Sequence, residues 1–303
     1  MFLSVIISTF NPSVSRFSQT LNSLKDQTIA PEFWELIIID NNSTNNFTNE
    51  LDLNWHPQIS IFREPTQGLT HARVKGFTEA NYSIIIMVDD DNVLSSDYLS
   101  NTLNIFKDHQ SVGAIGGRSI PLFEVTPPEW IINFYSSLAL RDLGENVFID
   151  SWDNKYPVSA PIGAGMAIRK EALYSYVKKV TSGENLITDR KGSSLSSGGD
   201  NDIVLEILRS GWDVGYFPSL TLKHIISYDR VRANYLARLI NNTNKSWVQL
   251  LEGHGINPWA KIAKWTVPLR KIKAWFSYRA WKSPVNYINW KGACGTFEGL
   301  GDI

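Results

Sequence analysis

Three consecutive aspartates, Asp89, Asp90 and Asp91, directly follow the apolar run 84–88. Adjacent carboxylates repel one another and lose favourable hydration when buried, so packing alone does not explain them. A divalent cation such as Mg²⁺ or Mn²⁺ relieves the repulsion, because it binds carboxylate oxygens together with phosphate oxygens of a substrate. If the strand continues, Asp89 and Asp91 point the same way, so one can hold a metal and the other a ribose hydroxyl. The alternative is a helix start, because the aspartate, asparagine and serine found here are all N-cap types.

Two earlier apolar runs also end in polar clusters, at residues 8–11 and 40–43. Apolar runs predict strands at 3–9, 33–40, 59–65 and 82–89, and helical spacing predicts helices at 14–24, 69–80 and 98–106. Apolar strands separated by helices are typical of a parallel sheet that is covered on both faces. Ligands of such sheets bind beyond the carboxyl ends of the strands, so we expect the three polar clusters to share one rim.

The second half of the chain is less regular. We expect a helix after Pro127-Pro128, a strand leading into a helix at 163–173, a helix at 200–211 closed by Gly211, strands at 212–218 and 221–225, and a helix at 227–252. The polar stretch 181–199 is interpreted either as a lid over a substrate or as an ordinary loop.

Composition limits the class of protein. The chain has 303 residues, 43% of them hydrophobic and 19% charged, which is typical of a globular protein. A single cysteine, Cys294, excludes an internal disulfide framework and fits a reducing compartment. The apolar start is interpreted as a first strand rather than a signal peptide, and no apolar run reaches the length of a membrane span. We therefore expect a cytoplasmic protein, either free or peripheral at the inner face of the membrane.

The C-terminal part is basic and rich in tryptophan. Residues 253–297 contain eight lysines and arginines, neither aspartate nor glutamate, and five of the eleven tryptophans. Within 257–283, apolar residues at helical spacing are flanked by cations, and Pro268 is expected to kink the helix. Three interpretations stay open: contact with anionic lipid, packing on the domain with a solvated basic side, or nucleic-acid binding, which lacks a base-reading motif.

Five segments, in order, resemble the motifs of inverting glycosyltransferases of family 2. They are VIISTFN at 5–11, IDNNST at 39–44, GLTHARVKG at 68–76, DDD at 89–91 and GAGMAIR at 163–169. The resemblance covers about residues 2–226. It implies an α/β GT-A fold, with a mostly parallel central sheet flanked by helices. It also implies a catalytic domain at 1–226, with a nucleotide-sugar half at 1–110 and an acceptor half at 111–226, and a helical extension at 227–303.

The resemblance also implies roles for individual residues. Binding of the nucleotide-sugar is expected from Ser8, Thr9, Asn11, Asp40, Asn42, Arg73, Asp89 and Asp90. Asp91 and His224 are expected to hold Mn²⁺ or Mg²⁺, although a lone histidine is more often structural. Arg73 suits a base or a diphosphate, and its alternative is an exposed helix arginine. The family's second aspartate of the 40–43 loop is Asn41 here, which leaves the nucleobase open.

A catalytic base is expected just before the helix at 200–211. The family pattern is G-E-D-x-D, and here Gly198–Asp202 matches it with Gly199 in place of the glutamate. Asp200 corresponds to the base, and Asp202 is the alternative. Without catalysis, Asp200 would serve as an N-cap and Asp202 as a favourable charge near the helix N-terminus.

The resemblance predicts direct displacement of a nucleoside diphosphate with inversion, because a single carboxylate serves as base. The acceptor would be a growing cell-surface glycan or a lipid-linked saccharide. Two other functions remain open: a non-catalytic protein that binds nucleotide-sugars, and a sugar nucleotidyltransferase. The latter needs a Gly-rich, basic phosphate loop after the first strand, which the segment 8–17 does not supply.

Overall fold

The structure is a computed structural model that describes residues 2–184 and 198–303. The expected lid at 181–199 therefore lies mostly outside the described residues. The described chain forms two compact units. Unit 1 comprises residues 2–122, 139–184 and 203–225, and unit 2 comprises residues 123–138, 198–202 and 226–303.

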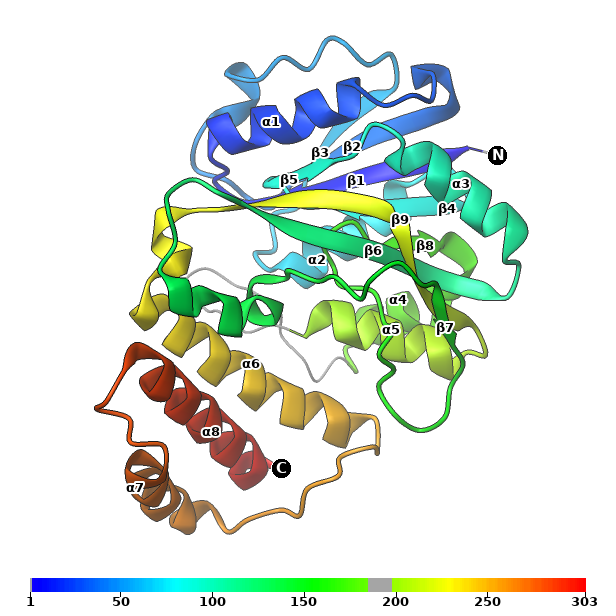
Figure 1. The fold of residues 1–303 in the computed structure, drawn as a ribbon. Helices are drawn as coiled ribbons and strands as arrows, with labels where there is room; N and C mark the ends of the chain where they lie inside the picture. Colours follow the sequence, from blue (N-terminus) through cyan, green and yellow to red (C-terminus); the bar gives the residue numbers. More distant parts are fainter. Residues whose placement is uncertain (1, 185–197) are drawn as a thin grey trace. The chain divides into compact units, whose positions relative to one another are not determined.

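Nine strands of the described chain form one sheet (Figure 1). They are β1 (Leu3–Thr9), β2 (Trp34–Asp40), β3 (Ile59–Arg63), β4 (Ile84–Val88), β5 (Asn92–Leu94), β6 (Val112–Phe123), β7 (Phe148–Asp150), β8 (Ala167–Arg169) and β9 (Asp213–Ile226). Their order is β3-β2-β1-β4-β8-β6-β9-β5, and β7 pairs with β9. The four predicted strands of the first half are confirmed as β1 to β4.

The sheet is mixed rather than mostly parallel. Strands β3, β2, β1 and β4 are parallel neighbours. From β8 onward the pairing changes, because β8 is antiparallel to both β4 and β6, and β9 is antiparallel to β5 and β7. The α/β class predicted from the sequence is confirmed. The mainly parallel arrangement holds only for the part of the sheet formed by β3, β2, β1 and β4.

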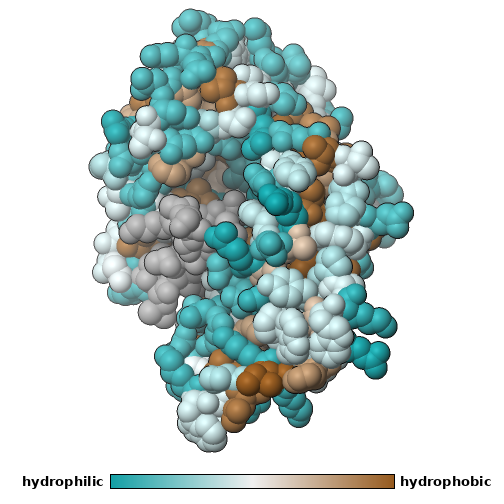
Figure 2. Space-filling model, turned by 90° about the vertical axis from the view of Figure 1, so that its left-hand side faces the viewer, coloured by the Kyte–Doolittle hydropathy of each residue, from teal (hydrophilic) through white to brown (hydrophobic). Residues whose placement is uncertain are grey.

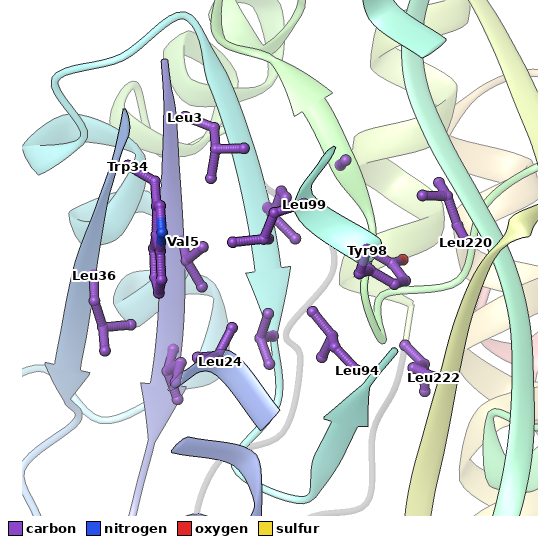
Figure 3. Close-up of a cluster of buried hydrophobic side chains, with 14 of the residues drawn as sticks. Leu3, Val5, Leu24, Trp34, Leu36, Leu94, Tyr98, Leu99, Leu220 and Leu222 are labelled. Atoms are coloured by element: carbon purple, nitrogen blue, oxygen red, sulfur yellow. The ribbon is translucent and has the colours of Figure 1, made fainter. Parts of the chain in front are cut away.

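The helices are α1 (Val14–Lys25), α2 (Leu69–Glu79), α3 (Tyr98–Asp108), α4 (Tyr174–Thr181), α5 (Gly199–Arg209), α6 (Ala233–Gly253), α7 (Val267–Ser277) and α8 (Pro284–Asp302). Side chains of β1 alternate between the two faces of the sheet. Leu3, Val5 and Ile7 belong to one core with α1 and α3, whereas Ile6 belongs to a second core with α2, α4 and α5. Figure 3 shows the first core, in which Trp34 and Leu36 of β2 lie beside Val5. Helices therefore cover both faces of the sheet, as predicted.

The prediction that Gly211 closes α5 is confirmed. Gly211 has φ +88°, which glycine adopts without the Cβ penalty. Its N–H donates to the carbonyl of Leu208, and the N–H of Trp212 donates to the carbonyl of Ile207. This pair of hydrogen bonds is the Schellman motif, and it fixes the point at which the chain leaves α5 and enters β9.

Three expected helical features are wrong in detail. The helix expected after Pro127-Pro128 is only a 3-10 segment at Glu129–Phe134, followed by a short 3-10 turn. The helix expected at 227–252 begins as a 3-10 turn, and α6 proper starts at Ala233. Pro268 does not kink a helix, because it stands in the first turn of α7, where its missing N–H needs no partner.

Candidate functional site

The carboxyl ends of β1 and β2 form one polar rim. Thr9 lies opposite Asp40 in the parallel register, and the Asn41 N–H donates to the Thr9 carbonyl at 2.8 Å. The Asn11 side-chain oxygen accepts the Thr44 N–H at 2.8 Å, while the Asn11 N–H donates to Ser43 Oγ at 2.9 Å. The expected joining of the first two polar clusters is confirmed by these contacts.

The aspartates after β4 join the same rim. The Thr9 hydroxyl donates to the Asp90 carboxylate, which links the ends of β1 and β4 directly. Beyond Val88 the strand does not continue, because the Asn92 N–H donates to the Asp89 carbonyl at 3.1 Å and closes a turn. The condition under which Asp89 and Asp91 would point the same way is therefore not met. The turn instead leads into β5, which the sequence interpretation had missed.

Strand β5 brings Asp91 to His224. Asn92 lies opposite His224 in the antiparallel pair β5–β9, and the Ile225 N–H donates to the Asp91 carbonyl at 2.8 Å. As a result, His224 Nε2 lies 3.4 Å from Asp91 Oδ1, with 2% of the histidine side chain and 19% of the aspartate exposed. An imidazole nitrogen and a carboxylate oxygen facing each other suit a divalent transition metal such as Mn²⁺. The two residues predicted as metal ligands are brought together, and their chemistry fits the metal.

Asn41 explains the departure from the family pattern. Its side chain is buried, and its amide nitrogen donates to the carbonyls of Glu64 at 3.2 Å and Thr66 at 2.8 Å. Its amide oxygen accepts the Gly68 N–H at 2.7 Å. An aspartate could accept the last of these bonds but could not donate the first two. Asn41 therefore holds the connection from β3 to α2 in place, rather than offering a carboxylate at the rim.

Three other predicted binding residues are Asn42, Asp40 and Ser8. Asn42, with φ +65°, accepts a hydrogen bond at 2.6 Å from the Arg63 guanidinium. Asp40 accepts the Ser43 N–H at 2.8 Å. Ser8 is half-buried on β1. All three stand at the carboxyl ends of neighbouring strands, so the rim gathers six of the eight predicted nucleotide-sugar residues (Ser8, Thr9, Asn11, Asp40, Asn42, Asp90), with Asp89 following directly after β4.

Arg73 belongs to α2 and is only 7% exposed. The alternative that Arg73 is an exposed helix arginine is therefore wrong. The structure shows no substrate, so its contact with a base or a diphosphate stays a prediction. Arg169, by contrast, has a structural role, because its guanidinium donates to the carbonyls of Phe106, His109 and Val112.

The glycine-rich segment 163–169 is shaped by Tyr98. Its hydroxyl donates to the Gly165 carbonyl at 2.7 Å, and burial raises the pKa of Tyr98, so this donor stays protonated. Gly165 has φ +75°, and a Cβ there would lie 2.6 Å from the Tyr98 hydroxyl. Only glycine fits this position, which accounts for its place in the motif.

Asp200 and Asp202 lie in the first turn of α5 and belong to unit 2. Asp200 is half-buried. Asp202 is 1% exposed, and its Oδ1 lies 2.7 Å from Nε2 of His254, the residue that ends α6. Glu206 follows Asp202 one turn along α5, so this helix carries side chains of metal-ligating types. Sequence reasoning missed His254, because 52 residues separate it from Asp202 and nothing local marks it.

No helix among the described residues is long and apolar enough to cross a membrane.

Residues 4–176, more than half of the chain, match the family model for glycosyl transferase family 2. A poly(ribitol-phosphate) beta-glucosyltransferase of Bacillus spizizenii is 29% identical over 141 residues, which are 43% of this chain and 22% of that protein. The chain thus spans less than a quarter of the length of this relative.

Solved structures of S. aureus TarS resemble the chain in fold. Residues 1–349 of TarS in complex with UDP-GlcNAc match over 97% of this chain and 91% of that one, with a TM-score of 0.56 and 14% identity. The complex of the same TarS segment with UDP matches over 100% of this chain and 90% of that one, with a TM-score of 0.52 and 15% identity. At such identities the likeness concerns the fold alone, and it bears out the predicted GT-A architecture with a helical C-terminal region.

Proposed function

This chain belongs to glycosyl transferase family 2, and from that premise we propose that it transfers a sugar from a nucleoside-diphosphate sugar to a hydroxyl group of a cell-surface glycan. The observation that carries the proposal is the polar rim at which the ends of β1, β2 and β4 meet. The names of similar proteins guide the choice of substrates. UDP-GlcNAc, seen with TarS, is the first donor to test, and poly(ribitol phosphate) is the first acceptor.

The rim supplies groups suited to a nucleotide. Hydroxyl and amide groups of Ser8, Thr9 and Asn11, together with Asp40 and Asn42, are assigned to the base and ribose. Asp89 and Asp90 are assigned to the sugar nucleotide, and the Thr9 hydroxyl bond to Asp90 orients that carboxylate. Arg73 is assigned to the diphosphate, because a guanidinium can donate two hydrogen bonds to the oxygens of one phosphate group.

Asp91 and His224 are the residues assigned to a divalent metal, Mn²⁺ or Mg²⁺. The buried imidazole and the carboxylate face each other at 3.4 Å, which supports Mn²⁺ more than Mg²⁺, since Mg²⁺ prefers oxygen ligands alone. A metal bound there would neutralise charge on the departing diphosphate. His224 belongs to β9, and the hydrogen bond from the Ile225 N–H to the Asp91 carbonyl places the backbone of Asp91 beside it.

Asp200 is assigned as the base that removes the proton from the acceptor hydroxyl. Asp202 is the weaker candidate, because its carboxylate is buried and hydrogen-bonded to His254. One base acting in a single displacement gives inversion at the anomeric carbon, so an α-linked donor would yield a β-linked product. A positioned base of this kind contributes about 10²–10⁴-fold to the rate.

The proposed division of labour follows the sequence. Residues 1–226 would form the catalytic domain, with donor binding in 1–110 and acceptor binding in 111–226, and residues 227–303 would form an extension. We place the reaction in the cytoplasm, at the inner face of the membrane, where a saccharide acceptor linked to lipid would lie. The surface that could hold the protein there is considered below.

Substitution of Asp200 tests the catalytic assignment. Transfer from UDP-GlcNAc and other UDP, GDP and dTDP sugars is measured with Mn²⁺, and the product anomer is read by NMR. Asp200→Asn should lower kcat about 10²–10⁴-fold while the thermal shift caused by the donor stays unchanged. Asp108→Asn, the same change at an exposed position of α3, serves as the matched control. An unchanged kcat in Asp200→Asn, or retention in the product, would overturn the assignment.

A further inference from the structure

A row of large apolar side chains is exposed along α7 in unit 2. Trp265, Leu269, Ile272 and Phe276 are 75%, 61%, 58% and 63% exposed. Leu269, Ile272 and Phe276 lie in α7, and their spacing of three and four residues puts them within an arc of about 60° on one helix face. Trp265 precedes them in the 3-10 turn Lys264–Thr266 that leads into α7. Single exposed apolar residues are ordinary, but a contiguous row of them marks an interaction surface. These four residues are called the α7 stripe.

The opposite face of α7 is the one that packs. Val267 and Ala274 are buried, and Trp275 meets Trp290 of α8 edge-on with ring centroids 4.7 Å apart. The indole N–H of Trp290 donates to the Lys271 carbonyl at 3.0 Å. Helix α7 therefore packs on unit 2 through the face opposite the α7 stripe, and the stripe takes no part in that packing.

Trp281 extends the stripe beyond the end of α7. It is 60% exposed, and its ring lies 5.9 Å from that of Phe276 in an edge-on contact. Figure 2 shows brown, hydrophobic side chains exposed among teal, hydrophilic ones in the lower part of the picture. Tryptophan is enriched where proteins meet the headgroup region of a bilayer, because its ring is apolar and its N–H is polar.

The charge around the stripe has one sign. Residues 257–283 contain seven lysines and arginines and neither aspartate nor glutamate. Lys264 and Lys271 are paired with Asp302 and Glu298 of α8, and the remaining five (Lys261, Arg270, Lys273, Arg279, Lys282) are exposed. On α7 itself, Lys273 and Arg270 lie about 70° and 130° around the helix from the centre of the stripe. On a lipid surface, these two cations could therefore contact phosphate groups while the stripe enters the acyl layer.

We propose that α7 docks on an anionic lipid surface, with the α7 stripe and Trp281 inserted among the acyl chains and the flanking cations bound to lipid phosphates. A helix with an apolar stripe, aromatic residues and basic flanks is the form that lies in the plane of a membrane interface. A second copy of the chain fits less well, because a symmetric contact would bring the same five exposed cations of each copy together. The proposal deepens the proposed function by supplying a way to reach a membrane-linked acceptor.

Vesicle sedimentation tests the proposal without any sugar transfer. The purified chain is mixed with vesicles of phosphatidylcholine alone, or with 30% phosphatidylglycerol, at low and high salt. We expect binding only to the anionic vesicles and a loss of binding at high salt, because a Debye length shrinks from about 10 Å at 0.1 M to about 3 Å at 1 M. Each cation near the surface contributes about fivefold to the partition coefficient.

Two double variants separate the apolar and the ionic parts. Trp265→Ser with Phe276→Ser should lower partitioning at least tenfold, and Arg270→Glu with Lys273→Glu at least about twentyfold. Ile132→Ser, at a position 64% exposed in unit 2, and Lys155→Glu, at an exposed position in unit 1, are the matched controls and should bind as the wild type does. Far-UV circular dichroism and the donor thermal shift should be unchanged in all variants.

Three results would overturn the proposal. The first is equal binding to neutral and anionic vesicles, and the second is no binding at any composition. The third is a dimer in light scattering that the stripe variant abolishes, which would assign the surface to a second copy. Loss of transfer with intact vesicle binding would instead count against the proposed function, so the two failures are distinguishable.

Discussion

Replacing Asn41 by aspartate would restore the residue of the family pattern, yet the structure predicts that this change destabilises unit 1. The Asn41 amide nitrogen donates to the carbonyls of Glu64 and Thr66, and a carboxylate cannot donate to either. Glu64 is half-buried and Thr66 is exposed, so water can solvate their carbonyls in the variant. Two hydrogen bonds at a net value of about 0.5–1.5 kcal/mol each then account for a loss of about 1–3 kcal/mol. The bond from the Gly68 N–H survives and becomes charge-assisted, which offsets part of this loss.

The measurement is thermal unfolding by differential scanning calorimetry. A loss of about 2 kcal/mol in a unit of this size lowers Tm by about 4–8 °C. The deficit should shrink as the pH is lowered, because burial favours the protonated side chain and a carboxylic acid regains one donor. Stability of the variant relative to wild type should thus fall as the pH rises.

The adjacent residue provides the control. Asn42 is more exposed, and its side-chain oxygen accepts a hydrogen bond from Arg63. Asn42→Asp keeps that acceptor and adds an ion pair that contributes about 0–1 kcal/mol, so Tm should hardly change or rise slightly. A Tm for Asn41→Asp within about 1 °C of wild type would refute the bracing role, and so would an equal fall in both variants.

Three further predictions follow from other parts of unit 1 and unit 2. Gly165→Ala should lower the free energy of unfolding by about 2–5 kcal/mol in urea titrations, because the new Cβ requires φ +75° and meets Tyr98 and Leu222. Asp91→Asn should abolish the increase in donor thermal shift that Mn²⁺ causes, whereas Asp108→Asn should retain it. Burial raises the pKa of the Cys294 thiol, although Lys271 and Lys291 oppose this, so iodoacetamide should label native protein far more slowly than urea-unfolded protein at pH 7.5.

Three of the four strands predicted in the first half, β1, β2 and β4, are buried almost throughout, whereas β3 is partly exposed. Every residue of β4 is buried, and such a strand needs apolar side chains throughout, which makes it visible without knowledge of its neighbours. Strand β6 contains three glycines and a proline within twelve residues, so its sequence gives no periodic signal. Its pairing with β8 depends on residues about fifty positions away. Long-range pairing of this kind leaves little trace in a local pattern.

The candidate site was also predicted only where a local sequence pattern marks it. Polar residues after apolar runs indicated the rim, because ends of parallel strands share one edge of a sheet. The turn at Asp89 and the three-residue β5 gave no signal, since β5 exists only through its pairing with β9. That pairing, rather than strand alternation, sets the position of Asp91 beside His224. The bracing role of Asn41 likewise depends on carbonyls more than twenty residues away.

The choice between Asp200 and Asp202 shows what side-chain contacts add to a motif. Spacing alone offers two carboxylates in the first turn of α5, and each also suits a helix N-terminus. The Asp202 carboxylate is 1% exposed and hydrogen-bonded to His254. Accepting a proton from a substrate would therefore require Asp202 to break its contact with His254. Asp200 lies in the same turn and is half-buried rather than buried, so its carboxylate is the more accessible of the two. Asp202 is then better understood as a structural partner of His254 within unit 2.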